Sequence, residues 1–314
     1  MRILFAGSPG IAVPALEALA GMGGGFAVAG LLTNPDSPRG RSGKPEPTEC
    51  AAAASRLFGD SVPVIKPEKL NGDARAQTEA LKADLLVSFA YGTIFGPKFL
   101  GLFPMGGINI HPSLLPQYRG PTPIPAAILS RDALTGITIQ QLAAEMDSGG
   151  ILAQEKVPLG GRETTASLSA VMAEKAAELL PQALRGIAGG TLRAVPQDHN
   201  SATYCTLIKK EDGLIDWRLS AAEIDAQVRA YNPWPHSFTM HGELQLSILK
   251  AGAVEGGGSD SPGRVLGKDS NKGILIQTGE GILAVGELQY RSKKALDWKA
   301  FLNGARNFTG TQLG

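Results

Sequence analysis

The sequence predicts a two-domain α/β protein, with a doubly wound, mostly parallel sheet in the N-terminal domain and a smaller β-barrel in the C-terminal domain. Two observations predict the first domain: apolar runs of strand length alternate with helical stretches, and polar side chains gather where strands end. The second domain is predicted by short β-like segments separated by Gly-rich turns, as in an open Greek-key barrel. We expect a Rossmann-like domain over residues 1–205 and an OB-like barrel over residues 206–314.

In the first domain, the order of elements follows from apolar runs and helical periodicity. Strands are predicted at residues 2–6, 26–32, 63–65, 84–89, 107–110, 136–142 and 151–157. Helices are predicted at residues 13–20, 48–57, 74–81, 97–102 and 164–187, the last capped by Thr164 or Thr165 and stopped by Gly189 and Gly190. On such sheets ligands bind beyond the carboxyl ends of the strands.

The second domain reads as short strands around one helix. Strands are predicted at residues 213–217, 243–250, 264–266, 273–277 and 282–288, and a capped helix at 220–229. The longest Gly-rich turn covers residues 252–263. Trp217 and Trp234 are expected to be core anchors, because large aromatic side chains are buried on average; the alternative is that they are platforms on which bases stack.

Composition excludes several classes of protein. The 314 residues are 43% hydrophobic and 19% charged, which is ordinary for a soluble globular chain. The formal net charge of +1 provides no global basic field, so any contact with nucleic acid must come from local patches. Two cysteines do not make a disulfide scaffold, and neither a signal-peptide pattern nor a membrane-length apolar run is evident. We expect a cytoplasmic protein.

Residues 106–123, which read GGINIHPSLLPQYRGPTP, place reactive side chains at the end of a predicted strand. Asn109 and His111 share one face because residues two apart in a strand project together. An amide donor beside an imidazole suits a carbonyl that becomes a tetrahedral oxyanion. Pro112 and Pro116 restrain the loop that follows. The alternative is an ordinary histidine at a strand end. The chain has no His or Cys pair at ligand spacing, so no metal is expected.

A third polar residue, Asp147, lies in the turn EMDSGG at residues 145–150. A histidine base usually has an acid that orients it, and the glycines of this turn allow close approach. Taken alone, Asp147 fits better as a turn-forming residue that bonds its own backbone. Together with Asn109 and His111 it forms the expected catalytic group, in which Asp147 fixes the imidazole tautomer.

These residues resemble the signature of folate-dependent formyltransferases, in which Asn-x-His precedes a Ser-Leu-Leu-Pro loop and an Asp-x-Gly turn. The AVPAL helix start at residues 12–16, KKEDGLIDW at 209–217 and NPWP at 232–235 are similar to methionyl-tRNA formyltransferases. The resemblance covers essentially the whole chain. Two positions depart from that family: Gly10, where an acidic residue is usual, and His236, where glycine is usual.

The resemblance implies a co-substrate and roles for individual residues. The co-substrate is 10-formyltetrahydrofolate, which gives its formyl group to an attacking amine, with Asn109 stabilising the oxyanion, His111 handling a proton and Asp147 supporting it. The residues expected to contact the folate are Ser113, Leu114, Leu115 and Pro116. The pterin edge is expected against backbone of residues 84–94 and of the Asp147 turn.

The expected formyl acceptor is initiator methionyl-tRNA. A loop at residues 34–48 carries Arg39, Arg41 and Lys44, and spaced cations of this kind can follow a phosphate backbone. In methionyl-tRNA formyltransferases a basic loop at this position contacts the acceptor stem. On composition alone, a solvated surface loop is an equal alternative. The C-terminal module further favours a large acceptor over a small nucleotide, and a monomer is expected.

Two other classes of function stay open on the sequence. One is a formyltransferase that acts on a sugar-nucleotide amine, which also has a β-rich second domain. The other is a non-catalytic RNA-binding protein that uses the barrel, in which case Asn109, His111 and Asp147 need not converge.

Overall fold

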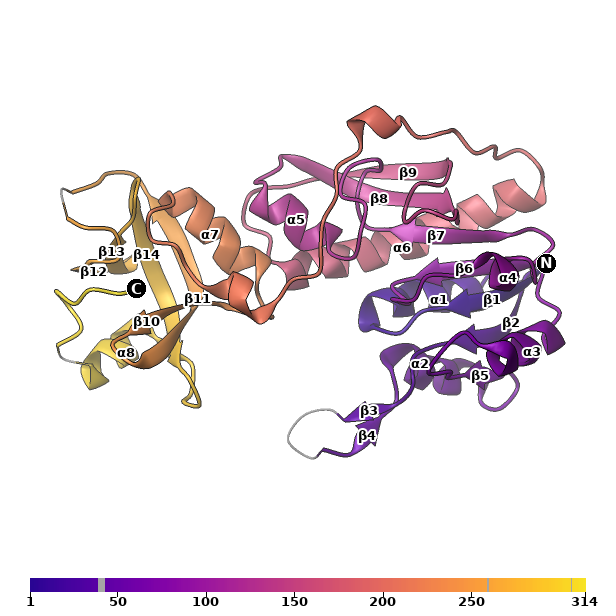
Figure 1. The fold of residues 1–314 in the computed structure, drawn as a ribbon, viewed down its shortest axis with the longest axis horizontal. Helices are drawn as coiled ribbons and strands as arrows, with labels where there is room; N and C mark the ends of the chain where they lie inside the picture. Colours follow the sequence, from indigo (N-terminus) through magenta and orange to yellow (C-terminus); the bar gives the residue numbers. More distant parts are fainter. Residues whose placement is uncertain (39–42, 259, 306) are drawn as a thin grey trace. The chain divides into compact units, whose positions relative to one another are not determined.

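The computed structural model describes residues 1–38, 43–258, 260–305 and 307–314. The chain forms two compact units (Figure 1). The first unit comprises Met1–Pro123, Leu134–Pro158 and Ser169–Thr206, and the second comprises Ile124–Ala133, Leu159–Leu168 and Leu207–Gly314. Among the described residues, no helix combines the length and the apolar character that a membrane span requires.

The first unit contains a seven-stranded sheet in the order β5-β2-β1-β6-β7-β8-β9. Its strands are β1 (Arg2–Ala6), β2 (Ala27–Leu32), β5 (Val64–Ile65), β6 (Leu85–Phe89), β7 (Gly107–His111), β8 (Leu134–Gln141) and β9 (Ile151–Pro158). The pairings from β5 to β7 are parallel, whereas β8 and β9 pair antiparallel. All five residues of β6 are buried, as expected when both faces of a sheet are covered. The predicted mostly parallel α/β sheet is confirmed.

Helices and short 3₁₀ turns lie between these strands and after β9. They are η1 (Gly10–Ala12), α1 (Val13–Ala20), α2 (Glu49–Phe58), α3 (Gly72–Ala80), α4 (Pro97–Leu100), α5 (Pro123–Leu129), α6 (Thr165–Ala188) and η2 (His199–Ser201). Thr48 caps α2 and Asn71 caps α3 by accepting backbone N–H bonds. A small hairpin, β3 (Ser37–Pro38) with β4 (Pro45–Glu46), forms the base of the basic loop.

The second unit is built on an antiparallel sheet in the order β10-β11-β14-β13-β12, with β15 paired to β14. Its elements are η3 (Lys210–Gly213), α7 (Ala221–Ala230), β10 (Ser237–His241), β11 (Leu244–Val254), β12 (Val265–Asp269), β13 (Gly273–Gln277), β14 (Ile282–Tyr290), β15 (Leu296–Asp297) and α8 (Trp298–Gly304). Ser220 and Glu223 form a capping box on α7. The predicted second β-rich domain is confirmed as an antiparallel-sheet fold.

Two predictions for the second unit are wrong. Residues 213–217 do not form a strand: Leu214 makes a single bridge to Phe238, and the Asp216 carboxylate accepts from the backbone of Arg218 and starts a turn. Such side-chain bonds compete with a strand ladder. Trp217 is a core residue at 4% exposure, but Trp234 is 58% exposed, so the expectation that it anchors the core is wrong.

Candidate active site

Asn109 and His111 lie at the carboxyl end of β7, and the Asp147 carboxylate lies close to both side chains. Asn109 Nδ2 donates to Asp147 Oδ1 at 3.4 Å, and His111 Nδ1 lies 3.6 Å from Asp147 Oδ2. The parallel neighbour β6 places Ser88 beside Asn109, and the antiparallel β8 places Gln140 on its other side. Three residues predicted from two separate motifs therefore converge at one edge of the sheet.

Asp147 is held by its turn and by three donors. Its φ is +52°, a left-handed conformation that aspartate tolerates better than most residues. Gly149 must be glycine, because a Cβ there would collide with the carbonyl oxygen of Gln141. Besides Asn109, Gln140 Nε2 donates to Oδ1 at 2.9 Å and the backbone N–H of Gly120 donates to Oδ2 at 2.9 Å.

The two ring nitrogens of His111 have different partners. Nε2 lies 2.9 Å from the carbonyl oxygen of Tyr118, which can only accept, so Nε2 carries a hydrogen. In the neutral ring Nδ1 is then unprotonated, and it is this nitrogen that faces Asp147. The ring is 3% exposed, and burial lowers the pKa of His111 below its ordinary value despite the opposing effects of the Asp147 charge and the Tyr118 carbonyl. Nδ1 is thus suited to accept a proton.

The backbone of the loop after His111 is fixed by β8 and β9. Thr138 Oγ1 donates to the Ser113 carbonyl at 2.7 Å and accepts from the Leu115 N–H at 3.2 Å. Gln154 Nε2 donates to the Leu115 carbonyl at 2.8 Å. Ser113 is fully buried and its hydroxyl donates to the Gln117 carbonyl at 2.6 Å.

These bonds divide the four residues expected to bind folate. Ser113 and Leu115 are buried parts of the frame. Leu114 and Pro116 are half-buried, so their side chains remain accessible from outside the loop. The loop is therefore rigid, and two of its four side chains can contact a ligand.

The cations expected to bind tRNA are only partly described. Lys44 is exposed next to the β3–β4 hairpin. Arg39 and Arg41 lie outside the described residues.

Several residues of the site were not predicted from the sequence. Tyr118 and Gly120, which contact His111 and Asp147, directly follow the predicted loop, so their position was the available signal. Gln140 is opposite Asn109 in the β7–β8 register, which only the sheet pairing reveals. Gln197, which donates to the carbonyls of Asp147 and Gly149, belongs to a segment without any pattern.

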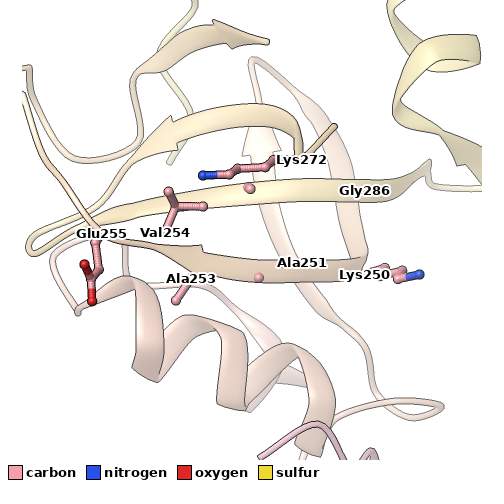
Figure 2. A pocket seen from close by; sticks show the side chains of 9 residues that line it. Lys250, Ala251, Ala253, Val254, Glu255, Lys272 and Gly286 are labelled. Atoms are coloured by element: carbon pink, nitrogen blue, oxygen red, sulfur yellow. The ribbon is translucent and has the colours of Figure 1, made fainter. Parts of the chain in front are cut away.

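No site for a metal is evident in the part of the chain that the structure describes, since no three His, Cys, Asp or Glu side chains gather. The second unit has a hollow of about 550 Å³ over β11 and β14 (Figure 2). Its walls are largely Gly and Ala, and the side chains of Lys250 and Lys272 extend in opposite directions. None of the residues expected to be catalytic lines it. These residues lie instead at the carboxyl edge of the first sheet.

The arrangement at that edge combines an amide donor, an unprotonated imidazole nitrogen and a carboxylate that stabilises the protonated ring. An amide donor stabilises an oxyanion, and an imidazole backed by a carboxylate moves a proton. The site therefore suits the transfer of an acyl group to an amine.

Comparisons with known proteins agree with this chemistry. The family model described as Formyl transferase matches residues 1–184, and that of the Formyl transferase C-terminal domain matches residues 207–306. A methionyl-tRNA formyltransferase of Treponema denticola is 49% identical, covering 98% of this chain and 98% of its own. Relatives of the same name from Treponema pallidum and Chloroflexus aurantiacus are 43% and 42% identical, over 100% and 97% of this chain and 99% and 97% of their own.

Solved structures of low identity share the fold. An N-formyltransferase of Helicobacter canadensis, in complex with folinic acid and dTDP-3-aminofucose, has a TM-score of 0.66 at 20% identity, covering 91% of this chain and 99% of that one. HypX of Aquifex aeolicus, in complex with tetrahydrofolic acid, has a TM-score of 0.64 at 18% identity, covering 98% of this chain and 48% of that one. With both halves of the chain matched by formyl transferase models and full-length relatives above 40% identity, this chain belongs to the formyl transferase family.

Proposed function

We propose that this protein transfers the formyl group of 10-formyltetrahydrofolate to the amino group of methionyl-initiator-tRNA. The observation that carries the reaction is the convergence of Asn109, His111 and Asp147 at the carboxyl edge of the first sheet. The acceptor is supported by full-length relatives at 42–49% identity that are named methionyl-tRNA formyltransferases. The sugar formyltransferases among the solved structures are only 17–20% identical.

The proposed mechanism gives a role to each of Asn109, His111 and Asp147. The methionyl amine attacks the formyl carbon, forming the new C–N bond, and the carbonyl oxygen becomes an oxyanion that accepts from the Asn109 amide. His111 Nδ1 takes the amine proton, directly or through water, and the imidazolium pairs with Asp147. Collapse of the intermediate breaks the bond to N10 of the folate, which takes the proton from His111. An oxyanion donor of this kind contributes about 10²–10³ in rate.

The folate is proposed to lie along the loop after β7. Leu114 and Pro116 offer accessible side chains, whereas Ser113 and Leu115 hold the loop in shape. Backbone of residues 84–94 and the Asp147 turn are proposed to hold the pterin edge. The complexes of HypX with tetrahydrofolic acid and of the Helicobacter canadensis enzyme with folinic acid support folate use on this fold.

The tRNA is proposed to contact the basic loop and the second unit. Arg39, Arg41 and Lys44 would follow the phosphates of the acceptor end, and residues 206–314 would supply the remaining contacts, with residues 1–205 as the catalytic domain. The near-neutral net charge makes such local cations necessary.

One assay tests the function and separates its rivals. The purified protein is incubated with 10-formyltetrahydrofolate in three parallel reactions. One contains charged initiator methionyl-tRNA, one a dTDP-amino sugar, and one no acceptor. We expect formyl transfer to the tRNA alone, and loss of transfer in His111→Ala, which should still fold and bind tRNA. Transfer to the amino sugar instead would favour the sugar enzyme. Binding of tRNA without any transfer, or normal turnover in His111→Ala, would refute the mechanism.

A further inference from the structure

We propose that Arg119 is a positioning residue of this site, which holds both His111 and Asp147 in place through its own backbone segment and through Gln197. The inference rests on the proposed formyl transfer. Arg119 is not within hydrogen-bond distance of either residue with its side chain, so its effect is exerted through other groups.

The backbone around Arg119 contacts both members of the proton-transfer pair. The carbonyl oxygen of Tyr118 accepts from His111 Nε2, and the N–H of Gly120 donates to Asp147 Oδ2, each at 2.9 Å. The residue between these two contacts is Arg119. A shift of this segment therefore moves the imidazole and the carboxylate together, and a displacement of about 1 Å can cost about 10²-fold in rate.

This segment belongs to no helix or named strand, so its position depends on hydrogen bonds to other parts of the chain. The N–H of Arg119 donates to the Thr203 carbonyl at 2.9 Å, and the N–H of Cys205 donates to the Arg119 carbonyl at 2.8 Å. Gly120 packs so closely on this partner segment that a Cβ would collide with the Cys205 carbonyl oxygen. The chain near residue 204 thus forms the outer support of the site.

The Arg119 side chain adds a second support. It is 2% exposed, and its Nε and Nη2 donate to Gln197 Oε1 at 3.1 and 2.7 Å. Nη1 donates to Tyr204 Oη at 3.3 Å and Nη2 to His199 Nδ1 at 3.2 Å. Within the described part of the chain, no carboxylate is close enough to form an ion pair with it. Burying a cation among neutral groups alone carries a desolvation cost.

Gln197 connects the guanidinium to the Asp147 turn. Because Arg119 occupies Oε1 of Gln197, the amide NH₂ group must point the other way. There it donates to the carbonyls of Asp147 at 2.9 Å and Gly149 at 2.7 Å, and to Gln140 Oε1 at 3.2 Å. Gln140 in turn donates to the Asp147 carboxylate. Arg119 thereby sets the orientation of the amide that holds the catalytic turn.

The test compares Arg119→Met, Arg119→Lys and Gln197→Glu with the wild-type protein. The glutamate keeps an acceptor for Arg119 but cannot donate, so it removes the bonds to the carbonyls of Asp147 and Gly149 and to Gln140 Oε1. Arg2→Met is the control, since the Arg2 guanidinium also donates to neutral acceptors, here the backbone carbonyls of Leu81 and Lys82, but at the amino end of β1. The measurements are kcat and KM for both substrates, thermal stability, and the titration of the His111 ring by NMR.

We expect Arg119→Met and Gln197→Glu to lower kcat about ten- to hundredfold while both KM values change less than about threefold. Because the Asp147 and Tyr118 contacts raise the pKa of His111, loosening them should move its titration to lower pH. Arg119→Lys should retain part of kcat, and Arg2→Met all of it. Unchanged kcat and titration in folded Gln197→Glu would overturn the proposal, even if Arg119→Met fails to fold. A wild-type protein that does not formylate methionyl-tRNA would refute the proposed function instead, and the titration still tests the positioning.

Discussion

At the residue scale, the partners of the two His111 nitrogens decide how the ring can act. By analogy with other catalytic triads, Asp147 is expected to fix the tautomer of His111. In the structure the Tyr118 carbonyl makes that choice, because it binds the Nε2 hydrogen and leaves Nδ1 facing the carboxylate. In the neutral ring, Nδ1 and Asp147 Oδ2 are both acceptors and lie 3.6 Å apart. They can form a hydrogen bond only after Nδ1 has taken a proton. Asp147 consequently stabilises the protonated ring, which is the form that follows attack by the amine.

This arrangement predicts the pH dependence. Because burial lowers the pKa of His111, kcat/KM should rise with pH along an acid limb whose midpoint lies below about 6.5. Asp147→Asn removes the charge that raises this pKa, so the midpoint should move to still lower pH. Loss of the supported base should lower kcat about 10²- to 10⁴-fold. Asp73→Asn, which changes an exposed carboxylate on α3, is the control for pH-rate profiles of the purified proteins.

A midpoint above the ordinary histidine value would contradict the buried, neutral ring. An upward movement in Asp147→Asn would contradict the pairing of the imidazolium with Asp147.

At the element scale, the loop after β7 is rigid because β8 and β9 bind its backbone. Thr138 is the central contact: its buried hydroxyl bonds the Ser113 carbonyl and the Leu115 N–H, and accepts from Gln154. The proline-bracketed sequence predicted a fixed loop. Its anchor on β8 was not predictable from the sequence, because a threonine in an apolar strand gives no indication of a partner 25 residues away.

Thr138→Val should therefore destabilise the fold and weaken folate use together. Valine has the same shape but leaves the Ser113 carbonyl and the Leu115 N–H without their partner, at a cost of roughly 1–3 kcal/mol in the free energy of unfolding. The KM for 10-formyltetrahydrofolate should rise, while the KM for tRNA should change little. Urea unfolding and steady-state kinetics measure both effects. Thr138→Ser keeps the hydroxyl and should stay near wild type; equal losses in the two variants would show that the methyl group matters and the hydrogen bonds do not.

The elements with clear periodicity were predictable, and those that depend on distant partners were not. The first predicted strand and the first predicted helix coincide with β1 and α1. β10 was missed because polar residues, Ser237 and Thr239, occupy its fully buried positions, where a predicted strand would carry apolar residues. The buried hydroxyl of Thr239 accepts a hydrogen bond from Trp217 Nε1. α5 was missed because prolines stand in its first turn, a position that tolerates them.

The same division applies to the site. Asn109, His111 and Asp147 stand beside recognisable turns and strand ends, so residue types, spacing and the family resemblance predicted that they converge. Their catalytic roles stay a prediction. Tyr118 and Gly120 contribute only backbone groups, which any residue possesses and which no sequence pattern marks. Gln197 reaches the Asp147 turn from 50 residues away.

At the scale of the whole molecule, a net charge of +1 leaves the chain without a general attraction for nucleic acid. An acceptor as large and as negatively charged as tRNA must then be bound by local cations. The basic loop is the sequence segment that concentrates them, and its described base is a hairpin of two-residue strands, with exposed Lys44 next to β4. Affinity for tRNA should therefore depend on a few side chains and on salt.

Arg41→Ala and Lys44→Ala should each raise the KM for initiator methionyl-tRNA about three- to tenfold and leave kcat and the KM for folate unchanged, because neither residue belongs to the reacting group. Each lost phosphate contact should also reduce the slope of log affinity against log salt by about 1. Binding is measured by titration at several salt concentrations. Lys98→Ala, which removes an exposed lysine on α4, should leave that slope unchanged. If all three variants bind tRNA with the wild-type slope, the loop is solvated surface and the phosphate contacts belong to the second unit. If Lys98→Ala weakens binding as much as the loop variants, diffuse charge rather than this loop holds the tRNA.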